Sequence, residues 1–297
     1  MPATTTPHGV SLNYDTFGDT RHPAMVLIQG LGAHMLGWHE EFCRLLADGG
    51  HHIIRFDNRD VGLSQKFPAG GYTLADMADD TTGLLDALNI DTAHVVGQSM
   101  GAMIAQLVAI RHPARVKSLA LIYSTPKTDF IHGIELLTER LDTPRPGSRV
   151  EAVDQYVKNE SASASTRYPR DVAWLRELGG LMYDRCHDPD GVRRQTQALQ
   201  NAEDLTPLLC RISTPTTILH GSDDRLIAPA ASTLLHDFIE DSVLTIHSGM
   251  GHELPRPLWD DIVGRISENA QIIARRRPNG EFVPTEELAG REGAKPN

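Results

Sequence analysis

Residues 94–101 read HVVGQSMG, and this stretch decides the fold. It contains the pattern GxSxG, with Ser99 between Gly97 and Gly101. The apolar pair Val95 and Val96 predicts a strand before the serine, and an apolar run predicts a helix after it. A reversal this sharp between strand and helix leaves no room for side chains beside the serine, so glycine at both positions is a steric requirement. The sequence therefore predicts a strained turn that presents the Ser99 hydroxyl.

The helix that follows Ser99 would point its amino end at this hydroxyl. Its first backbone amide, that of Met100, and the helix dipole can stabilise negative charge on an attacked carbonyl oxygen. We therefore interpret Ser99 as a nucleophile and Met100 as one donor of an oxyanion hole.

Strands and helices alternate around this motif, which is typical of a parallel sheet in an α/β fold. Residues 73–89 have helical spacing, and Thr73 with Asp76 resembles a capping box. Residues 10–17 alternate like an antiparallel edge strand. The other expected strands are residues 25–28, 53–56, 94–96, 119–123, 216–219 and 243–246.

The alternation stops in the middle of the chain. Residues 126–204 show only helical patterns, so we expect a helical cap there, inserted between two core segments, residues 1–125 and 205–275. Residues 276–297 are charged and rich in Pro and Gly, which predicts a flexible tail. The four helices expected in the cap are residues 133–141, 150–159, 171–182 and 192–202.

A serine needs a neighbouring base, because its hydroxyl hardly ionises at neutral pH. His252 lies in the loop SGMGHELPRP just beyond the last expected strand. Loops at the carboxyl ends of strands build the site of an open α/β sheet, so we predict His252 as the base. His247, at the end of the same strand, is the main alternative, and His220 is expected to support packing.

An imidazole base requires an acceptor at its second nitrogen. The segment ILHGSDDRLIAP follows the preceding strand and supplies two carboxylates. We favour Asp224, because the apolar segment after it would fold back against the sheet. Asp223 and Asp129 stay as alternatives.

In their order along the chain, Ser99, Asp224 and His252 resemble the α/β-hydrolase superfamily. The segments IQGLG (28–32) and FDNRDVGLS (56–64) are similar to two further family motifs. The resemblance implies a mostly parallel eight-stranded sheet flanked by helices, with a helical cap inserted after the sixth strand. It also implies that the amide of Leu31 joins Met100 in the oxyanion hole.

Two positions depart from the family patterns. Gln29 replaces the usual histidine before the oxyanion residue, and Asp60 stands where glycine is common. The first departure puts local hydrogen bonding in question rather than the chemistry.

The RDVGLS and GMGHELP segments most resemble bacterial methylesterases that act on anthracycline-type (aclacinomycin-type) polyketides. This resemblance implies a serine esterase that cleaves a carboxylic ester, such as a methyl or short-chain ester, through an acyl-enzyme on Ser99. Thioesterase, lactonase, carbon–carbon hydrolase and cofactor-free perhydrolase activities stay open. A ligand receptor that keeps a slow triad is an alternative of another class.

The cap is expected to select the substrate, a small ester. Aromatic and sulfur-containing side chains near the expected site could line an apolar pocket under it. These candidates are Trp38, Tyr123, Phe130, Trp174, Met182 and Tyr183.

Composition narrows the range of partners. The formal charge of -11 disfavours nucleic-acid binding, and no apolar run is long enough to span a bilayer. The amino-terminal residues do not resemble a secretory signal, and Cys43, Cys186 and Cys210 do not suggest a disulfide framework, so we expect a cytoplasmic protein. No metal or cofactor motif is present, and whether the chain forms a homodimer stays open.

Overall fold

The computed structural model describes residues 1–132 and 146–272. These residues contain one eight-stranded sheet in the order β1-β2-β4-β3-β5-β6-β7-β8. The pairs β1–β2 and β2–β4 are antiparallel, and all the other neighbouring strands are parallel. The strands are β1 (Ala3–Thr5), β2 (Ser11–Phe17), β3 (Ala24–Ile28), β4 (His52–Phe56), β5 (Ala93–Gln98), β6 (Val116–Ile122), β7 (Thr216–Gly221) and β8 (Ser242–His247).

The expected strands are present, with one difference at the edge. Ser11–Phe17 is antiparallel, as predicted, but it is not the edge strand, because Ala3–Thr5 pairs with its outer side. A three-residue strand that is mostly exposed leaves too short a pattern to be recognised in the sequence.

The helices follow the sheet as the alternation predicts. The α-helices are α1 (Glu40–Asp48), α2 (Leu74–Ala87), α3 (Met100–Arg111), α5 (Arg149–Ser161), α6 (Val172–Arg185), α7 (Pro189–Gln200), α8 (Ala230–Phe238) and α9 (Trp259–Ile272). Short 3₁₀ turns are η1 (Met35–Gly37), η2 (Pro113–Arg115), η3 (Thr128–Phe130), η4 (Thr206–Arg211) and η5 (Arg256–Leu258). Thr73 caps α2 and forms the expected capping box with Asp76.

The central strands β3 to β7 serve two hydrophobic cores, because neighbouring side chains point to opposite faces of the sheet. On β3, Val26 and Ile28 pack with residues of α2, α3 and α8. Met25 and Leu27 pack on the other face with residues of α1 and α9. The sheet is therefore covered on both faces, and only its strand ends are left for a site.

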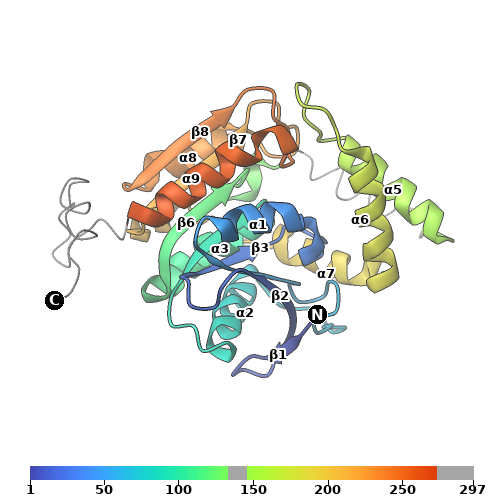
Figure 1. The fold of residues 1–297 in the computed structure, drawn as a ribbon, viewed down its shortest axis with the longest axis horizontal. Coiled ribbons are helices and arrows are strands. Elements are labelled where there is room, and N and C mark those ends of the chain that lie inside the picture. Colours follow the sequence, from blue (N-terminus) through green and yellow to red (C-terminus); the bar gives the residue numbers. More distant parts are fainter. Residues whose placement is uncertain (133–145, 273–297) are drawn as a thin grey trace, which may run out of the picture.

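Three helices, α5, α6 and α7, lie between β6 and β7 in the chain, and we call them the cap helices. Figure 1 shows them together on one side of the molecule, apart from α8 and α9. They correspond to the expected cap helices 150–159, 171–182 and 192–202, while the expected helix at 133–141 lies outside the described residues, as do residues 276–297.

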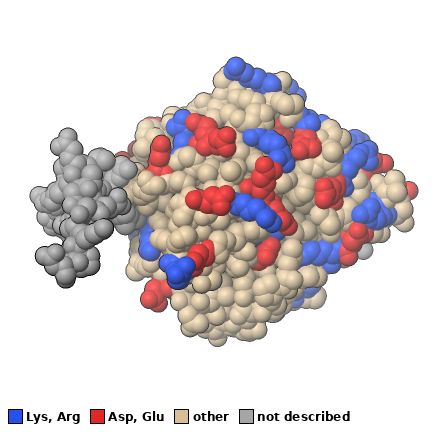
Figure 2. Space-filling view, in the orientation of Figure 1, with Lys and Arg blue, Asp and Glu red and all other residues tan. Residues whose placement is uncertain are grey.

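Charged side chains cover the surface in a mixed pattern. On the face shown in Figure 2, basic side chains lie beside acidic ones. Exposed ion pairs, Arg149 with Asp184 and Arg176 with Asp154, join α5 to α6.

Candidate active site

Ser99 occupies the turn between β5 and α3, and its backbone is strained. Its φ of 55° lies in the left-handed region, where residues other than glycine are uncommon. A Cβ atom at Gly97 would lie 2.3 Å from the carbonyl oxygen of Gly101, and one at Gly101 would lie 2.3 Å from that of Ile28. Both glycines are therefore required by the close approach of backbone to backbone.

Three loops at the carboxyl ends of strands bring Ser99, His252 and Asp224 into one hydrogen-bonded row. Nε2 of His252 lies 2.9 Å from Oγ of Ser99, and Nδ1 lies 2.7 Å from Oδ2 of Asp224. The imidazole thus connects a hydroxyl after β5 with a carboxylate after β7, and it is itself carried by the loop after β8.

Asp224 is buried and held from several sides. Its Oδ1 accepts hydrogen bonds from the amides of Leu226 and Ile227, and Nε2 of His220 lies 3.2 Å from Oδ2. Burial acts to raise the pKa of Asp224, but the charge of His252 and the hydrogen bonds from His220, His252 and Ile227 outweigh it. The pKa therefore lies well below its usual range, and the carboxylate stays ionised beside the imidazole.

The loop of His252 is fixed by a segment that lies between α5 and α6. The amide of His252 donates to the carbonyl of Ser163 at 2.8 Å, and the amide of Ser165 donates to the carboxylate of Glu253 at 2.7 Å. On the core side, the ring of Tyr123 lies 4.4 Å from the ring of His252, measured between centroids. The cap segment and Tyr123 together orient the imidazole.

The alternative site residues have other partners. His247 contacts Asp261 at 2.8 Å, and the half-buried Asp223 accepts hydrogen bonds from the hydroxyls of Thr166 and Ser222. Asp129 pairs with Lys127 at 3.0 Å.

His220 bonds through Nδ1 to the hydroxyl of Ser232, at 2.6 Å, and through Nε2 to the carbonyl of Ile227. It supports the turn that carries Asp224, which agrees with the packing role expected for it.

The loop after β3 lies against Ser99. A Cβ atom on Gly30 would lie 3.2 Å from the Cβ of Ser99. Leu31 is the next residue, so its amide belongs to backbone that lies close to Ser99. Met100 is the first residue of α3, and the first amides of a helix have no acceptor within it. Both amides predicted for the oxyanion hole are thus carried by backbone next to the hydroxyl.

Gln29 organises this loop through a chain of amide side chains. Its Oε1 accepts hydrogen bonds from the amide of Gly30, at 3.0 Å, and from Nε2 of Gln98. The Oε1 of Gln98 in turn accepts from the hydroxyl of Tyr123, and Asn58 donates to the carbonyl of Gln29 at 3.0 Å. The glutamine that replaces the family's histidine therefore uses its Oε1 and its backbone carbonyl to join this loop to β5 and to the loop after β4.

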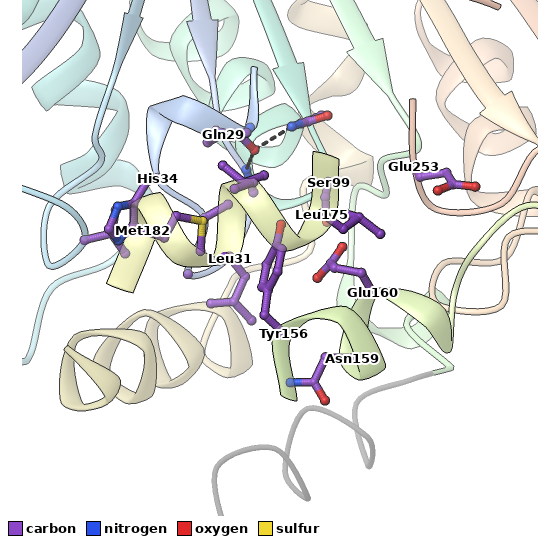
Figure 3. A pocket seen from close by; sticks show the side chains of 18 of the residues that line it. Gln29, Leu31, His34, Ser99, Tyr156, Asn159, Glu160, Leu175, Met182 and Glu253 are labelled. Atoms are coloured by element: carbon purple, nitrogen blue, oxygen red, sulfur yellow. Dashed lines mark hydrogen bonds between the residues drawn. The ribbon is translucent and has the colours of Figure 1, made fainter. Parts of the chain in front are cut away.

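A cavity of about 520 Å³ lies between the cap helices and the strand ends, and both Ser99 and His252 line it. Its walls include five of the six predicted pocket residues, namely Trp38, Tyr123, Trp174, Met182 and Tyr183. Figure 3 shows Met182, Leu175 and Leu31 around this space, with Ser99 at its edge.

Phe130, the sixth predicted pocket residue, does not line the cavity. Its ring packs against the core, and its carbonyl accepts a hydrogen bond from the amide of Ala228 at 3.0 Å. This bond and a bridge between Ile131 and Ile227 hold the segment after β6 against the loop that follows β7.

Sequence reasoning missed several cavity residues. Leu175 and Leu178 share α6 with Trp174 and Met182, so the helical spacing of these apolar residues was a usable signal. His34, Glu160 and Glu253 also line the cavity, and no spacing pattern distinguishes them in the sequence.

Neither a metal-binding cluster nor a membrane-spanning helix occurs in the part of the chain that the structure describes. Among residues 1–132 and 146–272, no group of three or more His, Cys, Asp or Glu side chains could hold a metal ion. In the same part of the chain, none of the helices combines the length and apolar character needed to cross a bilayer.

The chain belongs to the family described as alpha/beta hydrolase fold, which matches residues 23–254. It is therefore an enzyme of the α/β-hydrolase superfamily with hydrolase activity. This confirms the superfamily and the fold class expected from the sequence.

Individual relatives carry several hydrolase names. The chain is 30% identical to a protein of Variovorax paradoxus (strain S110) that carries the name carbamate hydrolase RutD, over 82% of this chain and 90% of that one. It is 27% identical to the rhodomycin D methylesterase DauP of Streptomyces sp. (strain C5), over 86% and 94%. The crystal structure of the enol-lactonase from Burkholderia xenovorans LB400 is similar in fold, with a TM-score of 0.73, 22% identity and coverage of 90% and 99%.

Proposed function

We propose that this protein is a carboxylic ester hydrolase that acts through an acyl-enzyme on Ser99. The observation that carries the proposal is the row of contacts from Asp224 through His252 to Ser99, at 2.7 and 2.9 Å. A hydroxyl, an imidazole and a buried carboxylate in this order have the geometry of nucleophile, general base and orienting acid.

In the acylation step, Nε2 of His252 accepts the proton of the Ser99 hydroxyl while Oγ forms a bond to the ester carbonyl carbon. The imidazole becomes positively charged, and the ionised Asp224 stabilises this charge through the proton on Nδ1. Because Asp224 keeps a depressed pKa, it stays an acceptor during this step and holds the ring in one tautomer.

The carbonyl oxygen gains negative charge in the tetrahedral intermediate. The amides of Leu31 and Met100 are the donors that would hold it, aided by the amino end of α3. When the intermediate collapses, the bond to the alcohol oxygen breaks and the alcohol takes the proton from His252. A water molecule then repeats the sequence on the acyl-enzyme and releases the acid.

The cavity and one relative support the proposed substrate class. The walls around Ser99 are largely apolar, so they suit an ester with an apolar body. The rhodomycin D methylesterase is named for cleavage of a methyl ester, and it matches most of this chain. We therefore favour methyl or short-chain esters, with a small alcohol as leaving group.

Hydrolysis of p-nitrophenyl acetate by the wild type and by Ser99→Ala tests the proposal. Ser99→Ala should lower kcat by about 10⁴-fold or more. A fluorophosphonate probe should label the wild type on the peptide that contains Ser99. Ser161→Ala, an exposed serine on α5, is the matched control and should keep wild-type activity.

Undiminished turnover by Ser99→Ala would overturn the proposal. A panel of methyl esters, thioesters, lactones and carbamates, measured on the same two proteins, separates ester cleavage from related activities. A single slow burst without turnover on the whole panel, together with large thermal stabilisation by one of the compounds, would instead indicate a receptor.

A further inference from the structure

His34 is a buried histidine in the wall of the active-site cavity that has no hydrogen-bond partner for Nδ1. It precedes η1 in the loop that follows β3, and only 5% of its surface is exposed. Nδ1 contacts no donor or acceptor among the described residues, although the residue lines the same cavity as Ser99. A buried polar atom without a partner is costly to folding, so it calls for an explanation.

The charged groups beside His34, Asp57 and Arg185, form hydrogen bonds with other residues. Asp57 accepts hydrogen bonds from the amides of Met35, at 2.9 Å, and Leu63, at 3.0 Å. It also pairs with Arg185 of α6, whose other terminal nitrogen bonds to Asn13. These contacts fix the wall behind His34 and leave its imidazole without a protein partner.

The imidazole of His34 is neutral near pH 7. Burial lowers its pKa to about 4, with Asp57 opposing the shift and Arg185 adding to it. A neutral imidazole offers one donor and one acceptor, and it does not balance the charge of a carboxylate or an ammonium group.

Apolar side chains separate His34 from the reacting atoms. In Figure 3, His34 lies beside Met182, toward one end of the labelled group, with Ser99 toward the other. The apolar residues of this wall and of the facing cap helices are Leu31, Val61, Leu175, Leu178, Met182 and Val192. A ligand that reaches from Ser99 to His34 therefore needs an apolar body with a polar group at a distance from the ester.

We propose that His34 is a specificity residue, which receives an uncharged hydroxyl or carbonyl group that the substrate carries at a distance from the scissile ester. The inference rests on the proposed function, because it assumes an ester bound at Ser99. It deepens that function by naming the substrate class as hydroxy- or oxo-substituted esters. A charged group in place of the hydroxyl or carbonyl would lose hydration there, and the neutral imidazole would not balance its charge, which is unfavourable.

A positional scan with oxo-esters tests the inference. Methyl octanoate and methyl 4-, 5-, 6- and 7-oxooctanoate are compared with octyl acetate and its oxo-substituted analogues, so that both sides of the ester are sampled. Each compound competes with p-nitrophenyl acetate, which measures kcat/KM for a substrate and also registers a slow substrate as an inhibitor. We expect one carbonyl position to be preferred about tenfold over the unsubstituted ester, the size of one net hydrogen bond.

Substitutions at His34 assign the preference. In His34→Leu the ratio of oxo-ester to unsubstituted ester should fall to about one, because the hydrogen bond is gone. In His34→Asn the side-chain amide places a donor or an acceptor at the position of Nδ1, so a preference should persist. His22→Leu, at an exposed histidine, is the matched control and should keep the wild-type ratio.

A flat scan in the wild type would overturn the inference, as would a preference that persists in His34→Leu. If His34→Leu does not fold, His34→Phe replaces it, since its ring has a similar shape but carries no nitrogen, and the ratio should still fall. Failure of the proposed function is read separately, from p-nitrophenyl acetate turnover that survives in Ser99→Ala.

Discussion

The side chain of Gln195, on cap helix α7, accepts a hydrogen bond from the backbone amide of Gly32, with 2.8 Å between Oε1 and N. Its Nε2 donates to the carbonyl of Arg59 at 2.7 Å, and the residue is fully buried. Gly32 directly follows Leu31, whose amide we assign to the oxyanion hole. One cap residue thus connects, through two hydrogen bonds, the core loops that follow β3 and β4.

Gln195→Met should weaken catalysis more than substrate binding. The substitution removes both hydrogen bonds but keeps a side chain of similar length, so the loop of Leu31 loses its support from the cap. We expect kcat on p-nitrophenyl acetate to fall about tenfold, because poorer placement of a single oxyanion donor affects only the transition state. The affinity for a boronic acid, which mimics the tetrahedral intermediate, should fall in parallel, while KM changes little.

Gln197→Met is the matched control, because Gln197 lies on the same helix and is exposed. It should leave kcat and boronic acid affinity unchanged. If Gln195→Met raised KM and left kcat unchanged, the residue would serve substrate binding and not the oxyanion loop.

This contact shows where prediction from the sequence ends. The helix that carries Gln195 was predictable, because residues 192–202 have helical spacing. Its contact with Gly32 was not, because it depends on how the cap packs against the core, and no local pattern encodes that packing. Phe130 illustrates the same limit, since its position after β6 suggested the pocket, but a bridge between Ile131 and Ile227 holds its segment against the loop after β7.

Asp224→Asn should lower kcat by about 10⁴-fold. The amide can present a donor to Nδ1 of His252, which favours the wrong tautomer and no longer stabilises the charged ring. The loss should appear in p-nitrophenyl acetate turnover and in the rate of fluorophosphonate labelling at Ser99. Because the pKa of Asp224 lies well below its usual range, wild-type activity should not show a separate loss from its protonation near pH 4.

Asp223→Asn provides the comparison within the same turn. Asp223 is half-buried and contacts Thr166 and Ser222 rather than His252, so this substitution should keep kcat within about twofold of the wild type. Equal losses in the two variants would mean that the turn acts as a whole and that Asp224 has no particular role.

Tyr123→Phe should reduce both stability and activity. The hydroxyl of Tyr123 donates to Gln98, and its removal leaves the buried Oε1 of Gln98 without this donor. We expect the free energy of unfolding to fall by about 1–3 kcal/mol. We also expect kcat to fall, because Gln98 supports Gln29, which holds the amide of Gly30 beside Ser99.

Urea denaturation and p-nitrophenyl acetate kinetics measure the two effects. Tyr14→Phe, on β2, is the matched control and should change neither. A Tyr123→Phe protein with wild-type stability would show that Gln98 finds another donor and that the chain of amides does not depend on the tyrosine.

The parts of this network were visible in the sequence, but their connection was not. Gln29 was recognised as a departure from the family motif, and Gln98 lies inside the GxSxG pattern. Their contact requires β3 and β5 to be neighbours in the sheet, and Tyr123 joins because β6 is next to β5. The order of the strands therefore had to be known before the role of Gln29 could be explained.

His94 should make the protein lose stability in mild acid. It lies on β5 with 5% of its surface exposed, and its Nδ1 contacts the hydroxyl of Ser118 at 2.8 Å. Burial lowers its pKa to about 3, with further contributions from His51 and Lys117. In the unfolded chain a histidine titrates near pH 6.5, so between pH 7 and pH 5 the unfolded state binds a proton that the folded state does not.

The stability contributed by neutral His94 is therefore present above about pH 6.5 and is lost as the pH falls toward 3. This linkage lowers the free energy of unfolding by about 2 kcal/mol between pH 7 and pH 5. In His94→Gln, whose amide can still bond to Ser118, the loss over this interval should be about 2 kcal/mol smaller than in the wild type, as measured by urea denaturation at the two pH values. His236→Gln, at an exposed histidine, should lose as much stability as the wild type, and an unchanged loss in His94→Gln would show that His94 takes up its proton in the folded state as well.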